Sequence, residues 1–424
     1  MVDRALSYFA EIPYSIIRDI AERVAEINKK AIKDDEKVID LSIGQNFLSH
    51  PDVILSKIEW IKAGGYREPI LYEPSLGPKE VRDMIAKNFY PYLYDLSKDI
   101  LDANNVMITD GAFGAVRNVL NAIMRPGDII VVDRITFRYF LSVLKVFGRV
   151  MPNTRPRIIM ATEDTGFVPT SSEIIDFLEK LKLMYPEKNI VYYTQFGFNP
   201  TGCFRSEREL KEIAQYIENE KNLFLINDIA YHLVRWSKRE IPLASILADE
   251  GAGIADADSL SKPFGLMGAR VGALITRDEN LFKYATRVQQ YTIVSPSKFA
   301  VDIWKVVSER ENLPEVDRYV KKTSLEIKEL YEYFAKEIEQ LGFDYCRKAS
   351  GTIYTFVKVP IKSSILWKEL LNKAKVAVVP GIAFTEPEDK VGEEYIRVTI
   401  SVKRRLLEES LERIEKFVNK NLKT

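Results

Sequence analysis

The chain has 424 residues, of which 46% are hydrophobic and 29% are charged, and its 61 basic residues balance its 61 acidic residues. This length and composition predict a soluble globular protein of roughly two or three domains with ample core. The formal net charge of zero argues against nucleic acid or a charged membrane surface as a partner, and no apolar run approaches the ~20 residues of a membrane span.

The few cysteines and histidines limit the chemistry that the chain can perform. Its two cysteines, Cys203 and Cys346, leave a disulfide open but fit a reducing compartment better than a secreted scaffold. Because no signal peptide is visible after Met1, we expect a cytoplasmic protein. The two histidines, His50 and His232, lie in no cysteine or histidine cluster, so no metal site is predicted.

The first part of the chain predicts a helix, a strand and a loop. An amphipathic helix is expected over residues 14–32. A short strand from Val38 to Ile43 then ends at Gly44, where the missing side chain lets the backbone approach a ligand. A loop punctuated by proline and glycine carries Tyr72, and a helical pattern follows from Lys79 to Phe89.

A strand over residues 106–109 runs into Gly111 and Ala112, where another helical pattern begins. Free backbone N–H groups at the start of a helix suit a phosphate, although an ordinary connection between a strand and a helix uses the same glycines. The strand Ile129 to Asp133 then leads to Phe137, where a further helix is predicted to open. Ligands of open α/β sheets lie beyond such strand ends.

The apolar strands that follow predict a parallel sheet covered on both faces. The strand over residues 190–193 leads to Asn199, and the strand over residues 223–226 leads to Asp228 and Tyr231. A carboxylate at the end of a buried strand is costly unless a cation or hydrogen-bond donors meet it. Asp228 is therefore a candidate functional residue.

The stretch from Ser259 to Gly272 combines several groups that suit a phosphate beside a reactive amine. Lys262 can form a Schiff base with an aldehyde cofactor. Ser259 and Ser261 offer hydroxyls, and Arg270 offers planar donors to phosphate oxygens. Alone, the stretch also fits a surface loop with a solvated lysine. The motifs elsewhere in the chain are needed to choose between these two interpretations.

Beyond about residue 295, the pattern predicts a separate α/β domain. Two long helices are expected over residues 296–311 and 315–341, followed by strands and helices that alternate. The last strand, Tyr395 to Ser401, contains Arg397, and an amphipathic helix follows it.

In their order from Leu41 to Arg397, these motifs resemble the class I/II aminotransferases, which are fold-type I pyridoxal-phosphate enzymes. The resemblance implies an α/β fold in which residues 49–300 form a three-layer αβα domain with a mostly parallel sheet. It implies a smaller α/β domain from both chain ends, with 1–48 as the arm and part of that domain and 301–424 as the rest. It also implies pyridoxal 5'-phosphate as cofactor, an L-amino acid and a 2-oxo acid as substrates, and a homodimer with shared active sites.

The resemblance assigns roles to residues around the cofactor ring. Lys262 would form the Schiff base and move the substrate Cα proton. Asp228 would pair with the pyridinium nitrogen, which predicts a lowered pKa for that carboxyl. Asn199 and Tyr231 would donate to the phenolic oxygen, and Phe137 would stack on the ring.

The resemblance also assigns the groups that bind phosphate and substrate. The phosphate ligands would be Gly111, Ala112, Ser259, Ser261 and Arg270, with Tyr72 reaching the phosphate of the neighbouring subunit. Arg397 would clamp the substrate α-carboxylate in bidentate fashion, with Gly44 and Asn199 beside it.

Three residues depart from the family pattern. Gln45 and Ile229 stand where glutamates are usual, and Ile135 stands where a proline is usual, but none of these changes removes a reacting group. No arginine stands where the family places one that binds a second, distal carboxylate of the substrate. Arg287 lies near that part of the chain, but the residues around it do not match the family pattern. An aromatic or broad apolar amino donor is therefore favoured over a dicarboxylic one.

Two alternatives stay open at this stage. The same fold and cofactor also serve lyases and decarboxylases. A non-catalytic ligand-sensing or interaction protein is a second alternative, against which the intact Lys262 argues. A nicotinamide enzyme is disfavoured because no Gly-x-Gly-x-x-Gly follows a strand, and a phosphate-loop enzyme because the chain has no Gly-Lys dipeptide.

Overall fold

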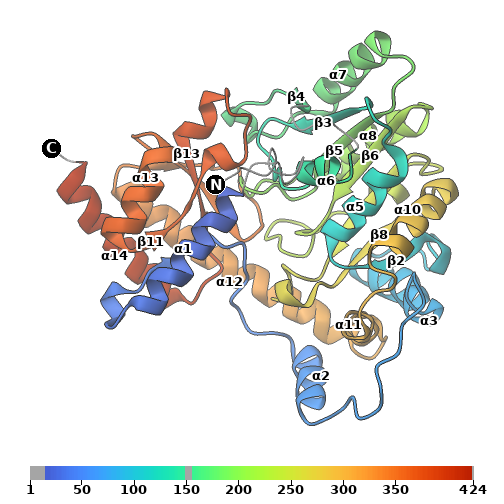
Figure 1. Cartoon of the computed structure of the whole chain (residues 1–424), viewed down its shortest axis with the longest axis horizontal. Coiled ribbons are helices and arrows are strands. Elements are labelled where there is room, and N and C mark those ends of the chain that lie inside the picture. Colours follow the sequence, from blue (N-terminus) through green and yellow to red (C-terminus); the bar gives the residue numbers. More distant parts are fainter. Residues whose placement is uncertain (1–14, 149–154, 423–424) are drawn as a thin grey trace, which may run out of the picture.

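The computed structural model describes residues 15–148 and 155–422 (Figure 1). In this described part, a seven-stranded sheet runs in the order β2-β8-β7-β6-β5-β3-β4. Strands β3 to β7 pair in parallel, whereas β8 runs antiparallel to both of its neighbours. The strands are β2 Val106–Thr109, β3 Ile129–Asp133, β4 Arg157–Ile159, β5 Ile190–Gln195, β6 Leu223–Asp228, β7 Ile254–Ser259 and β8 Gly272–Ile275.

Helices cover both faces of this sheet. Val116 of α5 shares one apolar cluster with Ile226 of β6, whereas Leu210 of α8 shares another with the adjacent Leu225. Neighbouring residues of a strand point to opposite faces, so the two clusters lie on opposite sides. The first face carries α5 Ala112–Ile123, α6 Leu141–Val146 and α10 Glu279–Thr292, and the second carries α7 Ser171–Met184, α8 Glu207–Glu218 and α11 Lys298–Ser308. The predicted three-layer arrangement with a mostly parallel sheet is confirmed.

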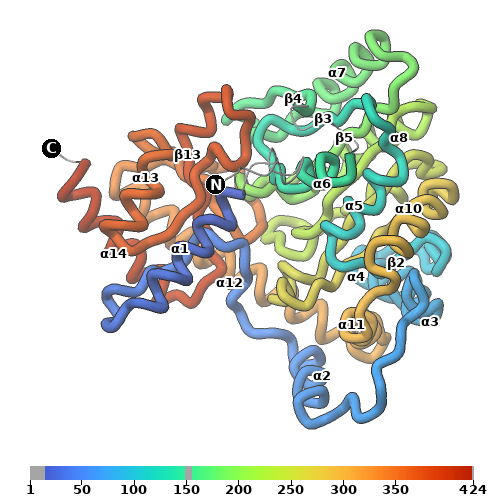
Figure 2. Tube along the Cα trace, in the orientation of Figure 1, coloured from blue at the N-terminus to red at the C-terminus, as the bar shows by residue number. Residues whose placement is uncertain are grey.

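A smaller sheet lies among the C-terminal elements, in the order β12-β13-β10-β9 with antiparallel pairing. Strand β1 pairs in parallel with β11, so an N-terminal segment is built into the C-terminal part. Figure 2 shows the blue helix α1 beside the orange and red elements. The strands are β1 Ile39–Asp40, β9 Asp344–Tyr345, β10 Tyr354–Lys358, β11 Val376–Ala377, β12 Val379–Pro380 and β13 Tyr395–Thr399.

The long helix α12 contacts both α11 and α14, and so connects the two parts of the fold (Figure 1). No helix within residues 15–148 and 155–422 is long and apolar enough to cross a membrane. The remaining helices are α1 Ile16–Lys30, α2 Asp52–Lys62, α3 Lys79–Met84, α4 Tyr90–Tyr94, α9 Ala244–Leu247, α12 Leu313–Gln340, α13 Ser363–Glu369 and α14 Arg404–Asn421.

The helix predicted to open at Phe137 is wrong in position, because α6 begins only at Leu141. The residues before it are held by the C-terminal part of the chain. The Thr136 N–H donates to the Phe384 carbonyl at 3.1 Å, and the Arg134 guanidinium binds Asp389. These contacts fasten residues 134 and 136 to the C-terminal part of the chain, and the segment from there to Phe140 is not helical.

Candidate active site

Most of the predicted site residues gather at one edge of the large sheet. Asp228 ends β6, Ser259 ends β7, and Asn199 follows β5. Parallel strands end at the same edge of a sheet, so these side chains approach one another despite their distance in sequence. Lys262 follows β7 by three residues and lies in the same region.

The Lys262 amine faces the backbone of the N-terminal segment. Its Nζ donates to the Gly44 carbonyl, and the Asn46 side chain donates to the Lys262 carbonyl at 3.0 Å. Burial lowers the pKa of the Lys262 amine, and the positive charges of Arg397 and Arg270 add to this effect. A lowered pKa increases the fraction of neutral amine, which is the nucleophilic form.

The Asp228 carboxylate is buried and meets neutral donors. It accepts hydrogen bonds from the Tyr193 hydroxyl at 2.8 Å and from the Ala230 N–H at 3.0 Å. Burial raises the pKa of Asp228 and outweighs these bonds and the charge of Lys262. The expected lowering of this pKa requires a cationic ring nitrogen opposite the carboxylate, so it stays a prediction for the cofactor-bound site. A buried carboxyl of this kind stays ionised most readily when a cation binds beside it.

Arg397 presents a buried guanidinium to the same site. Its Nη1 donates to Asn199 Oδ1 at 3.0 Å, and its Nη2 donates to the Ser42 carbonyl. The guanidinium lies 4.2 Å from the Tyr354 ring centroid and 5.2 Å from that of Phe384. Within the described residues, the buried Nε has no hydrogen-bond partner. Buried donors are normally paired, so this N–H remains available to an anionic ligand.

A third group of residues forms a cradle beside the first turn of α5. Gly111 has a positive φ of 86°, and a Cβ there would lie 2.7 Å from Arg270 Nη2. Arg270 Nη2 also donates to the Asp110 carbonyl at 3.0 Å. The hydroxyls of Ser259 and Ser261 lie 2.8 Å apart. The adjacent strands β2, β8 and β7 join the two halves of this cradle, since Gly272 of β8 pairs with both Thr109 and Ser259.

Two predicted residues lie outside this group. The Phe137 ring stacks on Tyr139 with centroids 6.0 Å apart, and Tyr139 meets Phe113 in the first turn of α5. Tyr72 is 87% exposed in the loop between α2 and α3. The stacking role of Phe137 and the role of Tyr72 in a neighbouring subunit stay predictions.

Sequence reasoning missed several residues that complete the site. Tyr354 accepts a hydrogen bond from the Tyr231 hydroxyl at 2.9 Å, and Tyr193 binds Asp228. Both tyrosines lie inside buried strands, where an aromatic residue predicts packing. Asn46 follows the recognised Gly44, but a side chain that bonds the Lys262 carbonyl has no sequence pattern of its own.

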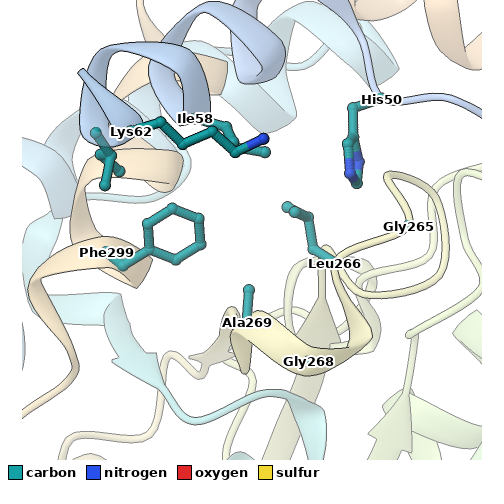
Figure 3. Close-up of a pocket in the computed structure, with 9 residues that line it drawn as sticks. His50, Ile58, Lys62, Gly265, Leu266, Gly268, Ala269 and Phe299 are labelled. Atoms are coloured by element: carbon teal, nitrogen blue, oxygen red, sulfur yellow. The ribbon is translucent and has the colours of Figure 1, made fainter.

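A cavity of about 330 Å³ lies between α2 and residues 265–269, which follow Lys262 in the chain (Figure 3). His50 borders it and binds the Phe264 carbonyl through Nδ1 at 2.7 Å. None of the residues predicted for the site lines this cavity. We therefore place the candidate active site at the strand edge and not in the cavity.

Comparison with known proteins gives matches over most of the chain. The family model described as aminotransferase class I and II matches residues 36–414. An aspartate aminotransferase of Pyrococcus horikoshii is 25% identical over 408 residues, which cover 94% of this chain and 96% of that protein. A probable N-acetyl-LL-diaminopimelate aminotransferase of Bacillus subtilis is 26% identical over 423 residues, covering 97% and 94%.

Solved structures show the same fold. A crystal structure of an aminotransferase from Mycobacterium tuberculosis superposes with a TM-score of 0.82 at 19% identity, covering 98% of this chain and 99% of that chain. The aspartate aminotransferase of Thermus thermophilus, solved with maleate, has a TM-score of 0.79 at 20% identity, covering 98% and 100%.

Proposed function

The chain belongs to the aminotransferase class I and II family, and on that premise we propose that it moves the amino group of an L-amino acid to a 2-oxo acid with bound pyridoxal 5'-phosphate. The observation that carries the proposal is the convergence of three groups at one strand edge: the Lys262 amine, the buried Asp228 carboxyl and the buried Arg397 guanidinium. Each group suits a different part of this chemistry.

The residues fit the cofactor part by part. An aldehyde reacts with a neutral lysine amine, and the lowered pKa of Lys262 favours that form. A protonated pyridine nitrogen would supply the cation that the buried Asp228 lacks. A phosphate would take donors from Arg270, the serine hydroxyls and the start of α5, at Gly111 and Ala112, where a helix N-terminus favours anions. When bound, the cofactor withdraws the electrons released at the substrate Cα.

The chain's own groups would then bind the substrate and move its proton. The unpartnered Nε and the Nη groups of Arg397 suit bidentate binding of an α-carboxylate, beside Gly44 and Asn199. The Lys262 amine would take the proton from the substrate Cα and return it at a different carbon. Tyr231 and Asn199 would donate to the phenolic oxygen of the ring, and Phe137 would stack on its face.

We further propose that the working unit is a homodimer in which Tyr72 reaches the phosphate of the neighbouring subunit. Gln289 near the end of α10 donates to the Ser75 carbonyl at 2.6 Å, which places this helix beside the loop that carries Tyr72. Exposed apolar residues are frequent in both segments, and contiguous apolar surface often marks an interface. The residues are Ile70 (60% exposed), Leu71 (79%), Tyr72 (87%), Tyr291 (91%) and Val294 (53%).

For the amino donor, we propose an aromatic or broad apolar side chain. Several relatives are named for acidic donors, such as the aspartate aminotransferase of Pyrococcus horikoshii. In this chain, no arginine matches a partner for a second carboxylate, and the partly buried Arg138 is already paired with Glu386 through Nη2. A second substrate carboxylate would therefore need a cation that is not yet assigned.

A panel of amino donors tests the function directly. Purified protein loaded with pyridoxal phosphate is mixed with phenylalanine, tyrosine, leucine or aspartate. The bound chromophore should convert to its amine form with release of the matching 2-oxo acid, faster for the first three donors than for aspartate. Borohydride reduction and peptide mapping should locate the cofactor on Lys262. Release of carbon dioxide or elimination products without the amine form would instead support a decarboxylase or lyase.

A further inference from the structure

Tyr354 lies between the groups that the proposed reaction uses. It begins strand β10 and is 1% exposed. Its hydroxyl accepts a hydrogen bond from the Tyr231 hydroxyl at 2.9 Å, and the Lys262 amine lies close to it. The Tyr354 hydroxyl and Lys262 Nζ both face Gly44, where a Cβ would overlap the hydroxyl and lie 3.3 Å from Nζ. The absence of a side chain at Gly44 thus leaves room for the Tyr354 hydroxyl and the Lys262 amine.

The surroundings of Tyr354 favour negative charge on its oxygen. The Tyr231 hydroxyl donates to that oxygen, the Lys262 amine lies close to it, and the Arg397 guanidinium lies 4.2 Å from the ring centroid. Burial alone would raise the pKa of Tyr354, but the charges of Lys262 and Arg397 outweigh burial and lower this pKa below its ordinary value. The phenol of Tyr354 therefore loses its proton more readily than that of the buried Tyr231, whose pKa burial raises.

We propose that Tyr354 is a positioning residue that holds the Lys262 amine against Gly44 and shares its proton. The assignment rests on Lys262 being the reacting amine of the proposed function. The Tyr354 oxygen accepts a hydrogen bond from the Nζ ammonium and stabilises it. When the proton passes from Nζ to that oxygen, an ammonium and a phenolate become a neutral amine and a neutral phenol. The neutral amine is the form that attacks an aldehyde.

The alternative is that Tyr354 only fills the core through its ring. Tyr354→Phe separates the two roles, because it keeps the ring against Arg397 and removes only the hydroxyl. Tyr395→Phe is the matched control, since Tyr395 is equally buried on β13, the strand paired with β10. Tyr395 stacks on Phe356 with centroids 4.6 Å apart and lies outside the group of residues around Lys262.

The experiment measures the reactivity of Lys262 against pH in the full-length chain freed of cofactor. Acetic anhydride labels neutral amines, and peptide mass spectrometry reads the label on Lys262 against that on the exposed Lys420. The hydroxyl stabilises the ammonium by a hydrogen bond, so its removal should lower the midpoint for Lys262 by about one pH unit. Tyr395→Phe should leave the midpoint in place. An unchanged midpoint in Tyr354→Phe, or equal shifts in both variants, overturns the proposal.

Failure of the proposed function gives a different result. If borohydride reduction of cofactor-loaded wild type finds no adduct on Lys262, the proposed function fails while the labelling still reports on the hydrogen bond. If the adduct forms and Tyr354→Phe titrates like wild type, only the role of Tyr354 fails.

A separate observation concerns the thiols. Cys203 and Cys346 are the only cysteines of the chain, and their buried sulfurs lie 3.5 Å apart. Cys203 follows the turn that carries Asn199, and Cys346 precedes the segment that leads into β10. Backbone bonds from Ser350 and Gly351 to the Gly202 carbonyl hold the two segments together. The thiols are therefore already side by side in the folded protein.

We propose that this pair is an oxidation site that closes to a disulfide in the presence of a small disulfide oxidant. Each thiol loses a proton, the two sulfurs bond, and the oxidant takes two electrons and two protons to give two thiols. The cross-link would tie the Asn199 turn to the segment before Tyr354.

Oxidised glutathione supplies the test. The wild type should lose both titratable thiols, with a mass decrease of about 2 Da, and its unfolding temperature should rise by about 5 °C because a long loop is closed. Cys203→Ser and Cys346→Ser should show no such rise. Two thiols that persist after long exposure, or a stable glutathione adduct on the wild type, would overturn the proposal.

Discussion

At Asp228, folding and catalysis make opposite demands on one carboxyl group. Burial disfavours its charged form, and the raised pKa records that cost. The proposed chemistry needs this charged form opposite the ring nitrogen. Replacement by asparagine keeps the shape and removes the charge, so it should separate the two demands.

We expect Asp228→Asn to lose activity and to gain stability at neutral pH. Loss of a charged hydrogen bond worth about 1.5–3 kcal/mol should lower kcat roughly 10- to 150-fold. The native pKa is raised, so the folded wild type loses stability as pH rises through the unfolded value of 3.8 to the native one. The cofactor-free variant should therefore unfold at a higher temperature than wild type at pH 7, with the difference shrinking toward pH 4.

Thermal unfolding and steady-state kinetics check both halves of this prediction. Asp344→Asn, at an exposed carboxylate, serves as the control and should change neither quantity. A variant at position 228 that keeps full activity would show that the carboxylate does not oppose a cationic ring.

Arg397 gives a second prediction at this scale. Arg397→Lys keeps the positive charge but removes the fork of donors, which includes the Nη1 bond to Asn199 and the free Nε. Bidentate binding of the substrate carboxylate is then lost, and we expect KM to rise about 10- to 100-fold, with a smaller change in kcat. An unchanged KM for every amino donor would remove Arg397 from the substrate site.

Single residues also show where sequence reasoning ends. Lys262, Asp228 and Arg397 could be recognised because each follows or occupies a predicted strand in a known order, and the structure brings them to one edge. Tyr354 could not, because its role depends on which residues face it across the fold. An aromatic residue in a buried strand predicts a packing role whether or not its hydroxyl meets an amine.

The element that most constrains the phosphate cradle is the turn between β2 and α5. Gly111 allows Arg270 to approach its backbone, and its positive φ excludes most other residues. Gly268, in the turn Met267–Ala269, has open space where a Cβ would stand. The two glycines therefore differ in what an added methyl group would do.

We expect Gly111→Ala to weaken cofactor binding by about 10- to 100-fold, because displacement of Arg270 removes charged hydrogen bonds to the phosphate worth about 1.5–3 kcal/mol. Gly268→Ala should bind the cofactor like wild type. Titration of each cofactor-free variant with pyridoxal phosphate, followed by absorbance, measures both affinities. Equal affinities in the two variants would place the phosphate elsewhere.

A helix or strand could be predicted from the sequence where nearby residues determine it, and could not where distant contacts do. The strands β3, β5 and β6 appear as apolar runs near their observed positions because burial on both faces demands such runs. The antiparallel direction of β8 left no pattern in the sequence, since strand direction is set by the connections of the whole sheet. The late start of α6 likewise depends on Phe384 and Asp389, which lie about 250 residues away.

At the scale of the whole molecule, the loop before α3 is held firmly although Tyr72 points into solvent. Asp302 of α11 accepts the Tyr66 hydroxyl at 2.7 Å and pairs with Lys57 and Lys298, and Lys298 lies 3.6 Å from Glu73. Contacts on both sides of Tyr72 thus fix the loop and leave its apolar tip exposed. Such an arrangement suits a tip that is presented to a second copy of the chain.

Hybrid dimers test whether Tyr72 acts across the interface. At a concentration of pyridoxal phosphate that saturates the wild type but not the variant, we expect Tyr72→Phe to lower activity. We expect Lys262→Ala to abolish activity. In a hybrid dimer, one subunit carries Tyr72→Phe and the other carries Lys262→Ala. If Tyr72 acts in the partner's site, one of the two active sites then has both defects and the other has none. Random mixing should restore about a quarter of wild-type activity, because half of the dimers are hybrids and one of the two sites in each hybrid is intact. If Tyr72 serves its own subunit, every site in the hybrid carries a defect, and mixed dimers will be no more active than the mean of their parents.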